Sequence, residues 1–483
     1  MSNVWETLGR PRYVVAPMVD ASELAWRLLS RRHGAHLCYT PMLHSNVFVN
    51  HPRYREVNLQ STPEDKPLIV QFCGNNPEIM LEAAKLAEAH CDAIDINLGC
   101  PQAIARKGHY GAFLQDDWQL LSNIVRTLSQ GVSVPITCKV RVFESVERTI
   151  AYARMLETAG CAMLTVHGRT REQRGPLTGL ASWDHIKAVR ESVNIPVIAN
   201  GNIQTLADVE RCLAQIGCEG VMTAEGNLYN PCLFEGRNPP VYEIASEYLA
   251  LVDQYPCPTS FVRGHLFKIF HECLSIPSNF EIRELLAKGP SVSEFKEVVE
   301  KLREIYEPIH EGRQLYTQEY TGYNLDLPPW VCQVRERMPP EDHLKKMEEA
   351  VSLQRSREEE SKDADEKENN NLSSGLKRTK RESSSERYLS KKKLKKMQKR
   401  SSENPHCRKV FEKCRECPNP VGLKCEYSLC KACCKAKCYL ENQDCPGHRI
   451  LTRTRRERAK SLANTPKLQT SASSPSDVQP ICR

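Results

Sequence analysis

The sequence predicts an α/β protein whose largest part is a TIM barrel, a ring of eight parallel strands that alternate with helices. Segments of strand type recur between residues 10 and 240, and apolar residues at three- and four-residue spacing fill most of the intervals. Eight such repeats in about 220 residues match the barrel in number and length. The predicted strands are residues 13–18, 36–41, 68–74, 93–99, 136–142, 163–168, 196–202 and 220–226.

An open doubly wound sheet is the alternative architecture. Such a sheet normally begins with a glycine-rich turn after its first strand. Here the first strand continues into "APMVDAS", which contains no glycine. Two helical segments, 145–160 and 205–217, end in a glycine just before the next strand, as a helix C-cap does. We therefore expect the barrel.

The rest of the chain differs from the barrel in composition. Residues 241–325 have a helical pattern and predict a helical domain. Residues 340–405 are first acidic and then basic, and they contain few aromatic or branched apolar residues, so we expect a disordered linker. Residues 407–448 are crowded with cysteine, and a Ser/Thr-rich tail, 449–483, is expected to be disordered.

The composition is typical of a soluble globular protein with some disordered chain, with 40% hydrophobic and 26% charged residues. No apolar stretch approaches the roughly 18 residues that cross a bilayer, and the N-terminus lacks a signal-peptide pattern. We therefore expect no membrane association and reduced cysteines, which number 22. The net charge of +7 decides little by itself.

The active site of a TIM barrel forms at the C-terminal ends of its strands. Lys139 lies within the apolar strand "TCKVR", where a lysine is costly unless it meets an anion. The glycine-bearing ends of the last two strands lie where such barrels commonly hold a phosphate. Together these features suggest FMN. The candidate residues at the strand ends are Pro17, Met18, Val19, Gln71, Asn97, Cys100, Lys139, Arg141, His167, Arg169, Asn200, Gly201, Asn202, Ala224 and Glu225.

Each of these residues also has a simpler explanation. Gln71 and Asn97 could cap strand ends, and His167 could be a structural histidine. Lys139 could pair with a buried carboxylate such as Asp95. Cys100 could be a buried small hydrophobe, since free cysteine is among the most buried residue types. The set favours a site because its members occupy seven strand ends of one barrel.

Several motifs resemble the tRNA-dihydrouridine synthase family over roughly residues 10–310. They are "APMVDASELAWR", "QFCGNNP", "DINLGCPQAIARKGHYGAFL", "CKVRV", "TVHGRT" and "IANGNI". Among the branches of the family, the chain looks most like the eukaryotic enzymes that act at positions 16 and 17 of the tRNA D-loop. The basic and cysteine-rich C-terminal part also fits that branch.

The resemblance implies roles for the candidate residues. Pro17, Met18 and Val19 would offer backbone groups to the flavin, Gln71 would contact its ring and Lys139 its pyrimidine edge. His167 would lie beside the cofactor. Asn200, Gly201, Asn202, Ala224 and Glu225 would form the phosphate cup. Cys100 would be the general acid, and Asn97 would lie between the flavin and the target base as a substrate contact. From their position at the barrel mouth, Arg141 and Arg169 are further candidates for contact with the substrate.

The implied reaction explains why these residue types are needed. Reduction of the uracil C5–C6 bond needs a hydride at C6, which reduced FMN supplies, and a proton at C5. A thiol, with an ordinary pKa of about 8.5, stays largely protonated at neutral pH and is acidic enough to give up its proton. The base must also leave the tRNA stack. The sequence does not distinguish NADPH from NADH as the electron donor.

Two departures from the family pattern stand out. Related enzymes usually carry Gly-Arg after the eighth strand, with the arginine on the FMN phosphate. This chain has "TAEGN" there, with Glu225 in place of the arginine, so we expect Glu225 to turn outward or flavin affinity to be reduced. His109 and Tyr110 also stand on the loop after Cys100, which could close differently over the base.

The cysteine cluster predicts zinc. Its C-x2-C spacings suit tetrahedral Zn²⁺, and eight or nine ligands would serve two ions. Disulfides are the alternative, and the spacing does not reveal which ligands share an ion. Because the segment is poor in apolar side chains, metal would drive its folding. The candidate ligands are Cys414, Cys417, Cys425, Cys430, Cys433, Cys434, Cys438, Cys445 and His448.

The basic run 377–400 has three possible interpretations: a solvated charge tract, a nuclear localisation signal or a phosphate-binding arm. We expect a location in the cytoplasm and nucleus, tRNA as partner and no obligate protein partner. Two rival functions are a flavin barrel that reduces a small pyrimidine and a non-catalytic RNA-binding protein on the same scaffold. The basic arm argues against the first, and intact Cys100, Lys139 and His167 argue against the second.

Overall fold

The computed structural model describes residues 4–316, 327–335, 341–342, 345, 412, 414–416, 421–422, 425–448, 450–454 and 456–457. The chain divides into two compact units, Met1–Leu372 and Ser373–Arg483. Most of the predicted linker and tail, including the basic run 377–400, lies outside the described residues. Among the described helices, none is long and apolar enough to pass through a bilayer.

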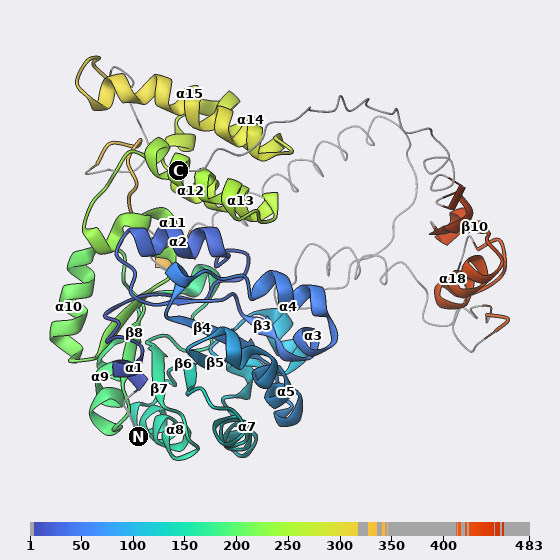
Figure 1. Ribbon diagram of the computed structural model, residues 1–483, viewed down its shortest axis with the longest axis horizontal. Coiled ribbons are helices and arrows are strands. Elements are labelled where there is room, and N and C mark those ends of the chain that lie inside the picture. The colour runs from blue at the N-terminus through green and yellow to red at the C-terminus, as the bar shows by residue number, and fades with distance from the viewer. Residues whose placement is uncertain are drawn as a thin grey trace, which may run out of the picture. The chain divides into compact units, whose positions relative to one another are not determined.

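The first unit contains the predicted TIM barrel (Figure 1). Its parallel strands are β1 (Tyr13–Val15), β2 (Cys38–Tyr39), β4 (Leu68–Cys73), β5 (Ala93–Leu98), β6 (Ile136–Arg141), β7 (Met163–His167), β8 (Val197–Asn200) and β9 (Gly220–Thr223). Each strand from β4 to β9 pairs with the next, β2 pairs with β4, and β1 pairs with β9. A bridge between Val14 and Leu37 joins β1 to the start of β2. All the predicted strands are therefore present, and the barrel is confirmed.

One strand was not predicted. β3 (Leu43–His44) pairs with the end of β4, where Leu43 lies opposite Phe72. It extends the wall of the barrel beside the end of β4.

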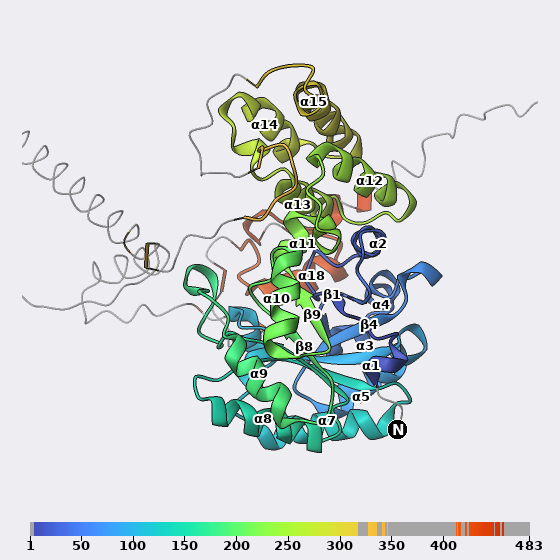
Figure 2. The ribbon, with the colours of Figure 1, turned by 90° about the vertical axis from the view of Figure 1, so that its left-hand side faces the viewer.

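Helices cover the outside of the barrel (Figures 1 and 2). The longer ones are α2 (Leu24–Arg32), α5 (Pro77–Ala87), α7 (Trp118–Gly131), α8 (Val146–Thr158), α9 (Trp183–Ser192) and α10 (Leu206–Ile216). α10 begins with a capping box of Thr205 and Asp208 and ends at Gly217 in the left-handed conformation. Short helices also occur: α1 (Val4–Thr7), α3 (Ser45–Asn50), α4 (Pro52–Asn58), α6 (Ala103–Gly108) and α11 (Glu225–Tyr229).

The interior of the barrel changes from apolar to polar along its axis. Alternate residues of a strand point to the same side, so one set of each strand faces inward. Near the N-terminal ends this set includes Ile69, Ala93, Met163, Ile198 and Met222, which pack into one buried cluster. Two residues further along β4 and β5 the inward positions hold Gln71 and Asp95, both fully buried. The polar layer supports the candidate site above it.

Four helices follow the barrel (Figure 2): α12 (Val241–Gln254), α13 (Thr259–Ile269), α14 (Phe280–Lys288) and α15 (Val292–His310). Their core also includes α2, where Trp26 stacks on His265 with ring centroids 3.8 Å apart. Residues 327–335 return to this core, although they lie beyond the predicted boundary at 325. Val241 donates its backbone N–H to Trp330, and Trp330 and Cys332 are buried.

The second unit is small. It contains α18 (Lys431–Leu440) and a hairpin of β10 (Asp444–Cys445) and β11 (Ile450–Leu451). Its buried cluster consists of five cysteines and one leucine: Cys414, Leu429, Cys430, Cys434, Cys438 and Cys445.

Candidate active site

A chain of buried hydrogen bonds runs from the barrel interior to Cys100. Asp95 accepts hydrogen bonds from Thr137 Oγ1 at 2.7 Å and from Gln71 Nε2 at 2.8 Å. Gln71 Oε1 in turn accepts from Asn97 Nδ2 at 2.8 Å. A carboxylate can only accept, so it fixes which end of each amide faces which neighbour. This leaves the Asn97 oxygen directed at the Cys100 loop.

Asn97 therefore holds the loop that carries Cys100. Its Oδ1 accepts from the backbone N–H of Cys100 at 2.9 Å and of Gly99 at 3.2 Å. On the other side, Ala112 N–H donates to the Cys100 carbonyl at 3.1 Å, and a Cβ on Gly111 would lie 2.8 Å from that oxygen. The backbone of Cys100 is thus fixed from both sides.

The Cys100 thiol is half-buried. Burial raises its pKa, although a backbone hydrogen bond from Gln102 and the charges of Arg141 and Lys139 act in the opposite direction. Tyr110, on the loop after Cys100, is buried and packs with Cys73 in the cluster beside Cys100. The exposed residue of that pair is His109.

Lys139 occupies the next strand, opposite Asn97 in register. Its Nζ donates to Asn200 Oδ1 at 2.9 Å, and Asn200 Nδ2 donates to the Met222 carbonyl. Burial and the neighbouring Arg141 lower the pKa of Lys139 to about 8, against the pull of Asp95. The hydrogen bonds of Asp95 described above go to neutral groups, while burial raises its pKa to about 6. The ammonium group is thus partly buried and bonded to an amide.

His167 and Arg169 follow β7 and contact each other. Arg169 Nη1 lies 3.1 Å from His167 Nε2, and Nη2 donates to Asn202 Oδ1 at 2.9 Å. Burial and the surrounding cations lower the pKa of His167 well below its ordinary value, so the imidazole is neutral. Arg169 also donates twice to the Gly179 carbonyl. It therefore braces the loop after β7.

Arg141, predicted to contact the substrate, donates to backbone carbonyls in this structure. Nε donates to Gly99 at 2.8 Å, and Nη1 donates to Thr170 at 2.7 Å and to Gln173 at 3.1 Å. Burial and the charge of Arg169 lower its pKa to about 10. The guanidinium group thus joins the Cys100 loop to the loop after β7. Arg174 adds a second link to Pro101.

The residues after β1 also have local partners. Met18 N–H donates to Ser22 Oγ at 2.8 Å, and its carbonyl accepts from Ala21. Pro17 and Met18 are half-buried, whereas the Val19 side chain is exposed.

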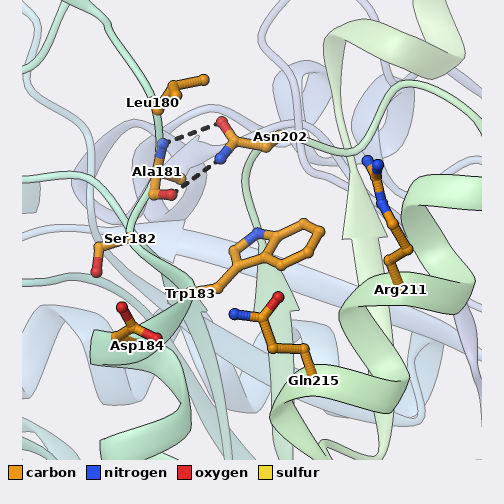
Figure 3. Close-up of a pocket in the computed structure, with 8 residues that line it drawn as sticks. All are labelled: Leu180, Ala181, Ser182, Trp183, Asp184, Asn202, Arg211 and Gln215. Atoms are coloured by element: carbon orange, nitrogen blue, oxygen red, sulfur yellow. Dashed lines mark hydrogen bonds between the residues drawn. The ribbon is translucent and has the colours of Figure 1, made fainter.

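Glycine is required at position 201, at the end of β8. Its φ is +117°, and a Cβ would lie 2.6 Å from the Ala181 Cβ and 3.2 Å from His167 Cδ2. Asn202, also at positive φ, bonds Ala181 through both ends of its amide (Figure 3). The chain therefore passes close beside His167 in a tight turn.

Ala224 and Glu225 begin α11. Glu225 acts electrostatically on two cations, Lys268 of α13 and Arg335, and favours their charged forms. Burial nevertheless lowers the pKa of Lys268, whereas the pKa of Arg335 is raised, chiefly by its hydrogen bond with Tyr229. The carboxylate that replaces the expected arginine therefore lies among cations of the helical part and of segment 327–335.

A pocket of about 390 Å³ opens beside this turn. Figure 3 shows the Trp183 indole between Asn202 and Gln215, with Arg211 on α10. The Trp183 Nε1 donates to the Gly201 carbonyl at 3.0 Å. Neither Cys100 nor Lys139 lines the pocket, whose residues are Leu180, Ala181, Ser182, Trp183, Asp184, Asn202, Arg211 and Gln215.

Sequence reasoning missed three supporting residues. Thr137 lies two positions before Lys139, and period-two alternation along β6 could have placed both on the inner face. Gln115, whose side chain donates to the Arg141 carbonyl at 2.7 Å, and Trp183 come from loops and helix starts. No pattern in the sequence indicates their contacts.

The predicted zinc ligands fall into groups within the second unit. Cys425, Cys434, Cys445 and His448 form one group, and Cys414, Cys430 and Cys433 form another. The Cys438 Sγ lies 3.9 Å from that of Cys434. Cys417 lies outside the described residues.

Comparisons with known proteins agree with this geometry. Residues 14–307 match the family described as Dihydrouridine synthase (Dus). A protein of Mus musculus named "tRNA-dihydrouridine(16/17) synthase [NAD(P)(+)]-like" is 49% identical over 461 residues, which cover 95% of this chain and 91% of that protein.

More distant relatives match as well. The tRNA-dihydrouridine(16/17) synthase [NAD(P)(+)] of Saccharomyces cerevisiae is 43% identical over 68% of this chain and 84% of its own length. A human protein named "tRNA-dihydrouridine(20a/20b) synthase [NAD(P)+]-like" is 34% identical over 54% of this chain and 83% of its own. Residues 14–307, which match the family model, include every candidate residue of the barrel. The chain belongs to the dihydrouridine synthase family.

Proposed function

We propose that this protein is a tRNA-dihydrouridine synthase that reduces uridines 16 and 17 of the tRNA D-loop with NADPH or NADH. The observation that carries the proposal is the hydrogen-bond chain that holds Cys100 at the barrel mouth near the partly buried Lys139. The family match and the names of the similar proteins support the reaction and the position.

The residues at the mouth fit FMN. Lys139 presents a partly buried cation, and the tight turn at Gly201 leaves backbone where a side chain would collide. Lys139 would hold the ring, the residues after β1 would flank it, and the turns at Asn200–Asn202 and Ala224–Glu225 would hold the phosphate. Gln71, which was predicted to contact the ring, is fully buried and uses both ends of its amide on Asp95 and Asn97, so it would support Asn97 instead. Lys268 and Arg335 offset the negative charge of Glu225, which favours retention of the flavin. When bound, reduced FMN supplies the hydride to C6 of uracil.

Cys100 supplies the proton to C5. Its raised pKa keeps the thiol protonated at neutral pH, and the bonds from Asn97 and Ala112 fix the loop that directs it. The thiolate that remains lies near the positive charges of Arg141 and Lys139, which stabilise it. Neutral His167 adds no further charge beside them.

The target uridine must leave the base stack to reach Cys100, which costs least in a single-stranded loop. We propose that α12–α15 and the basic segment 377–400 hold the tRNA, the latter through phosphates. We also propose that the cysteine-rich unit binds zinc and that the protein occurs in the cytoplasm and nucleus. The set of buried cysteines supports zinc, and the basic run of the sequence supports a nuclear location.

The test is an anaerobic absorption spectrum of the full chain, recorded before and after NADPH and again after unmodified tRNA. Flavin bands that bleach with NADPH and return with tRNA are expected. If the bands bleach with NADPH but do not return after tRNA is added, the flavin has stayed reduced, and this would contradict the proposed substrate.

The role of Cys100 is tested by Cys100→Ala, with Cys257→Ala in the helical part as the matched control. Cys100→Ala should bind tRNA and FMN as before and lose dihydrouridine formation by roughly a hundredfold or more, the usual contribution of a general acid. Cys257→Ala should keep its activity. Unchanged dihydrouridine in Cys100→Ala would rule out the assigned acid.

A further inference from the structure

The ligand-type side chains of the second unit separate into two groups. In the group of Cys425, Cys434, Cys445 and His448, one ligand atom of each residue lies within 4.8 Å of those of all the others. The group of Cys414, Cys430 and Cys433 meets the same condition by itself. Spacing along the chain does not reveal this division, because the two groups alternate in the sequence.

The first group has the donors and dimensions of a tetrahedral zinc site. With Zn–S bonds of about 2.3 Å and Zn–N bonds of about 2.0 Å, a sulfur and a nitrogen ligand of one tetrahedron lie about 3.5 Å apart. The Sγ of Cys445 lies 3.8 Å from His448 Nδ1. Three thiols and one imidazole complete four donors, a set typical of structural zinc. Cys434 and Cys445 are fully buried, which suits a closed structural site.

The surroundings of these side chains orient them. The backbone N–H of Leu429 donates to Cys425 Sγ at 3.5 Å, and the backbones of His448 and Glu426 donate to Cys445. Such bonds to ligand sulfurs are part of the outer shell of metal sites. A Cβ at Gly422 would collide with the His448 ring, so the glycine leaves room for the imidazole.

Cys438 is close to this group but does not belong to it. It lies four residues after Cys434 on α18, and the two sulfurs are 3.9 Å apart. Its sulfur does not meet the mutual distance that joins the other four. A ligand has to reach one common centre, so closeness to a single member is not sufficient.

A third group in the described residues shows the contrast. In the first unit, His33, Cys232 and Glu235 lie within the same distance of one another. There, however, His33 lies 3.0 Å from Glu247 and 3.3 Å from Glu235. Despite burial, hydrogen bonds with Cys232 and Glu247 raise its pKa to about 10. A protonated imidazole has no lone pair for a metal. That group forms an ion pair, whereas the group of the second unit contains no carboxylate.

We propose that one zinc ion is bound by three thiolates and one imidazole and that Cys438 is not a ligand; the ligands are Cys425, Cys434, Cys445 and His448. The inference rests on the proposed zinc binding of the cysteine-rich unit and names its ligands. Adjacent residues Cys433 and Cys434 then belong to different groups, and Cys425 lies in the chain between Cys414 and Cys430. The unit is therefore one interleaved structure, not two successive fingers.

Zinc content of the full chain tests the ligand set. We expect Cys425→Ser and Cys434→Ser each to lower the bound zinc by about one ion per chain, while Cys438→Ser, the matched control on α18, retains the wild-type content. Loss of zinc in Cys438→Ser with retention in Cys434→Ser would overturn this inference alone. A wild-type chain without zinc would contradict the proposed zinc binding itself. The flavin spectrum reports in each variant that the barrel is folded.

A second variant tests the ligand set without removing a ligand, so its result does not depend on whether the unit unfolds. His448→Cys keeps four donors but changes them from three thiolates and an imidazole to four thiolates. In the Co²⁺-substituted full chain the ligand-field spectrum should shift accordingly, with the metal content unchanged. An unchanged spectrum would remove His448 from the ligand set.

Discussion

At the scale of single residues, Asp95 sets the direction of the hydrogen bonds in the site. Its carboxylate can only accept, so Gln71 has to present its NH₂ group to Asp95 and its oxygen to Asn97. Asn97 then has to present its own oxygen to the N–H of Cys100. Three residues from two strands thus transmit one constraint to the loop of the proposed acid.

Asp95→Asn should therefore lower kcat, although the two side chains have nearly the same shape. An amide at position 95 no longer fixes the direction of the chain, because its NH₂ group can face either Thr137 or Gln71. Where it faces Gln71, the reversal passes along to Asn97 and deprives Cys100 N–H of its acceptor. An unsatisfied buried group costs about 1–3 kcal/mol, so we expect kcat to fall roughly ten- to a hundredfold. Steady-state kinetics and the rate of Cys100 alkylation by iodoacetamide measure the effect.

Thr137→Val is the matched control, because it removes a donor to Asp95 without reversing any amide. We expect a smaller loss of kcat in this variant. Equal losses in both would show that the buried carboxylate acts only through its packing.

Flavin binding should weaken as the pH rises through about 8. Burial lowers the pKa of Lys139 to about 8, so its positive charge is present below that pH and is lost above it. The Cys100 thiol, whose pKa is raised, keeps its proton over the same range. Equilibrium binding of FMN between pH 6 and pH 10 tests this expectation. In Lys139→Arg, whatever its affinity for FMN, that affinity should not decline between pH 6 and pH 10. If the decline persists in this variant, another group is responsible for the titration.

The strand-end residues could be predicted because a TIM barrel gathers its strand ends on one face. The hydrogen bonds among them could not be predicted, because the contact between Asp95 and Gln71 depends on the register between β4 and β5. Arg141 was assigned to the substrate from its position alone, whereas its partners come from three different loop positions.

At the scale of elements, the turn after β8 decides how the backbone approaches the proposed flavin phosphate. Gly201→Ala would place a methyl group against Ala181 and near His167, at a φ of +117°. We expect FMN affinity to fall at least tenfold, because the turn has to move away from its position. Flavin content after purification and titration with FMN measure the loss.

Gly217→Ala is the control for backbone strain. Gly217 also has a positive φ, +70°, but a Cβ there would meet nothing within 4 Å. The cost of about 1–2 kcal/mol for a left-handed alanine should lower stability without affecting the flavin. Similar flavin loss in both variants would mean that strain and not contact is responsible.

The predicted elements agree with the structure where local pattern determines them. The strands and helices of the barrel follow from periodicity, and Gly217 and Thr205 end and begin α10 as their residue types indicate. β3 and segment 327–335 were missed, because two-residue pairing and the burial of Trp330 depend on distant parts of the chain. The division of the cysteines into groups was missed for the same reason.

At the scale of the whole molecule, the two compact units have separate cores. A chain that ends at Leu372 should therefore keep its flavin and its kcat. We expect its KM for tRNA to rise and the dependence of tRNA affinity on salt to become shallower, because the basic run 377–400 is removed. Binding isotherms at several salt concentrations measure the change. Loss of flavin from the shortened chain would contradict the independence of the units.

The alternation of the two cysteine groups along the chain also has a genetic consequence. A stop codon or frameshift anywhere between Cys425 and Cys445 separates Cys425 from partners in its own group. If the break falls before Cys430, it also separates Cys414 from its partners. No shorter coding segment within the module specifies a complete set for both groups. A truncation inside the module therefore leaves the first group incomplete in every case, and the module has to be translated as a whole to carry both groups.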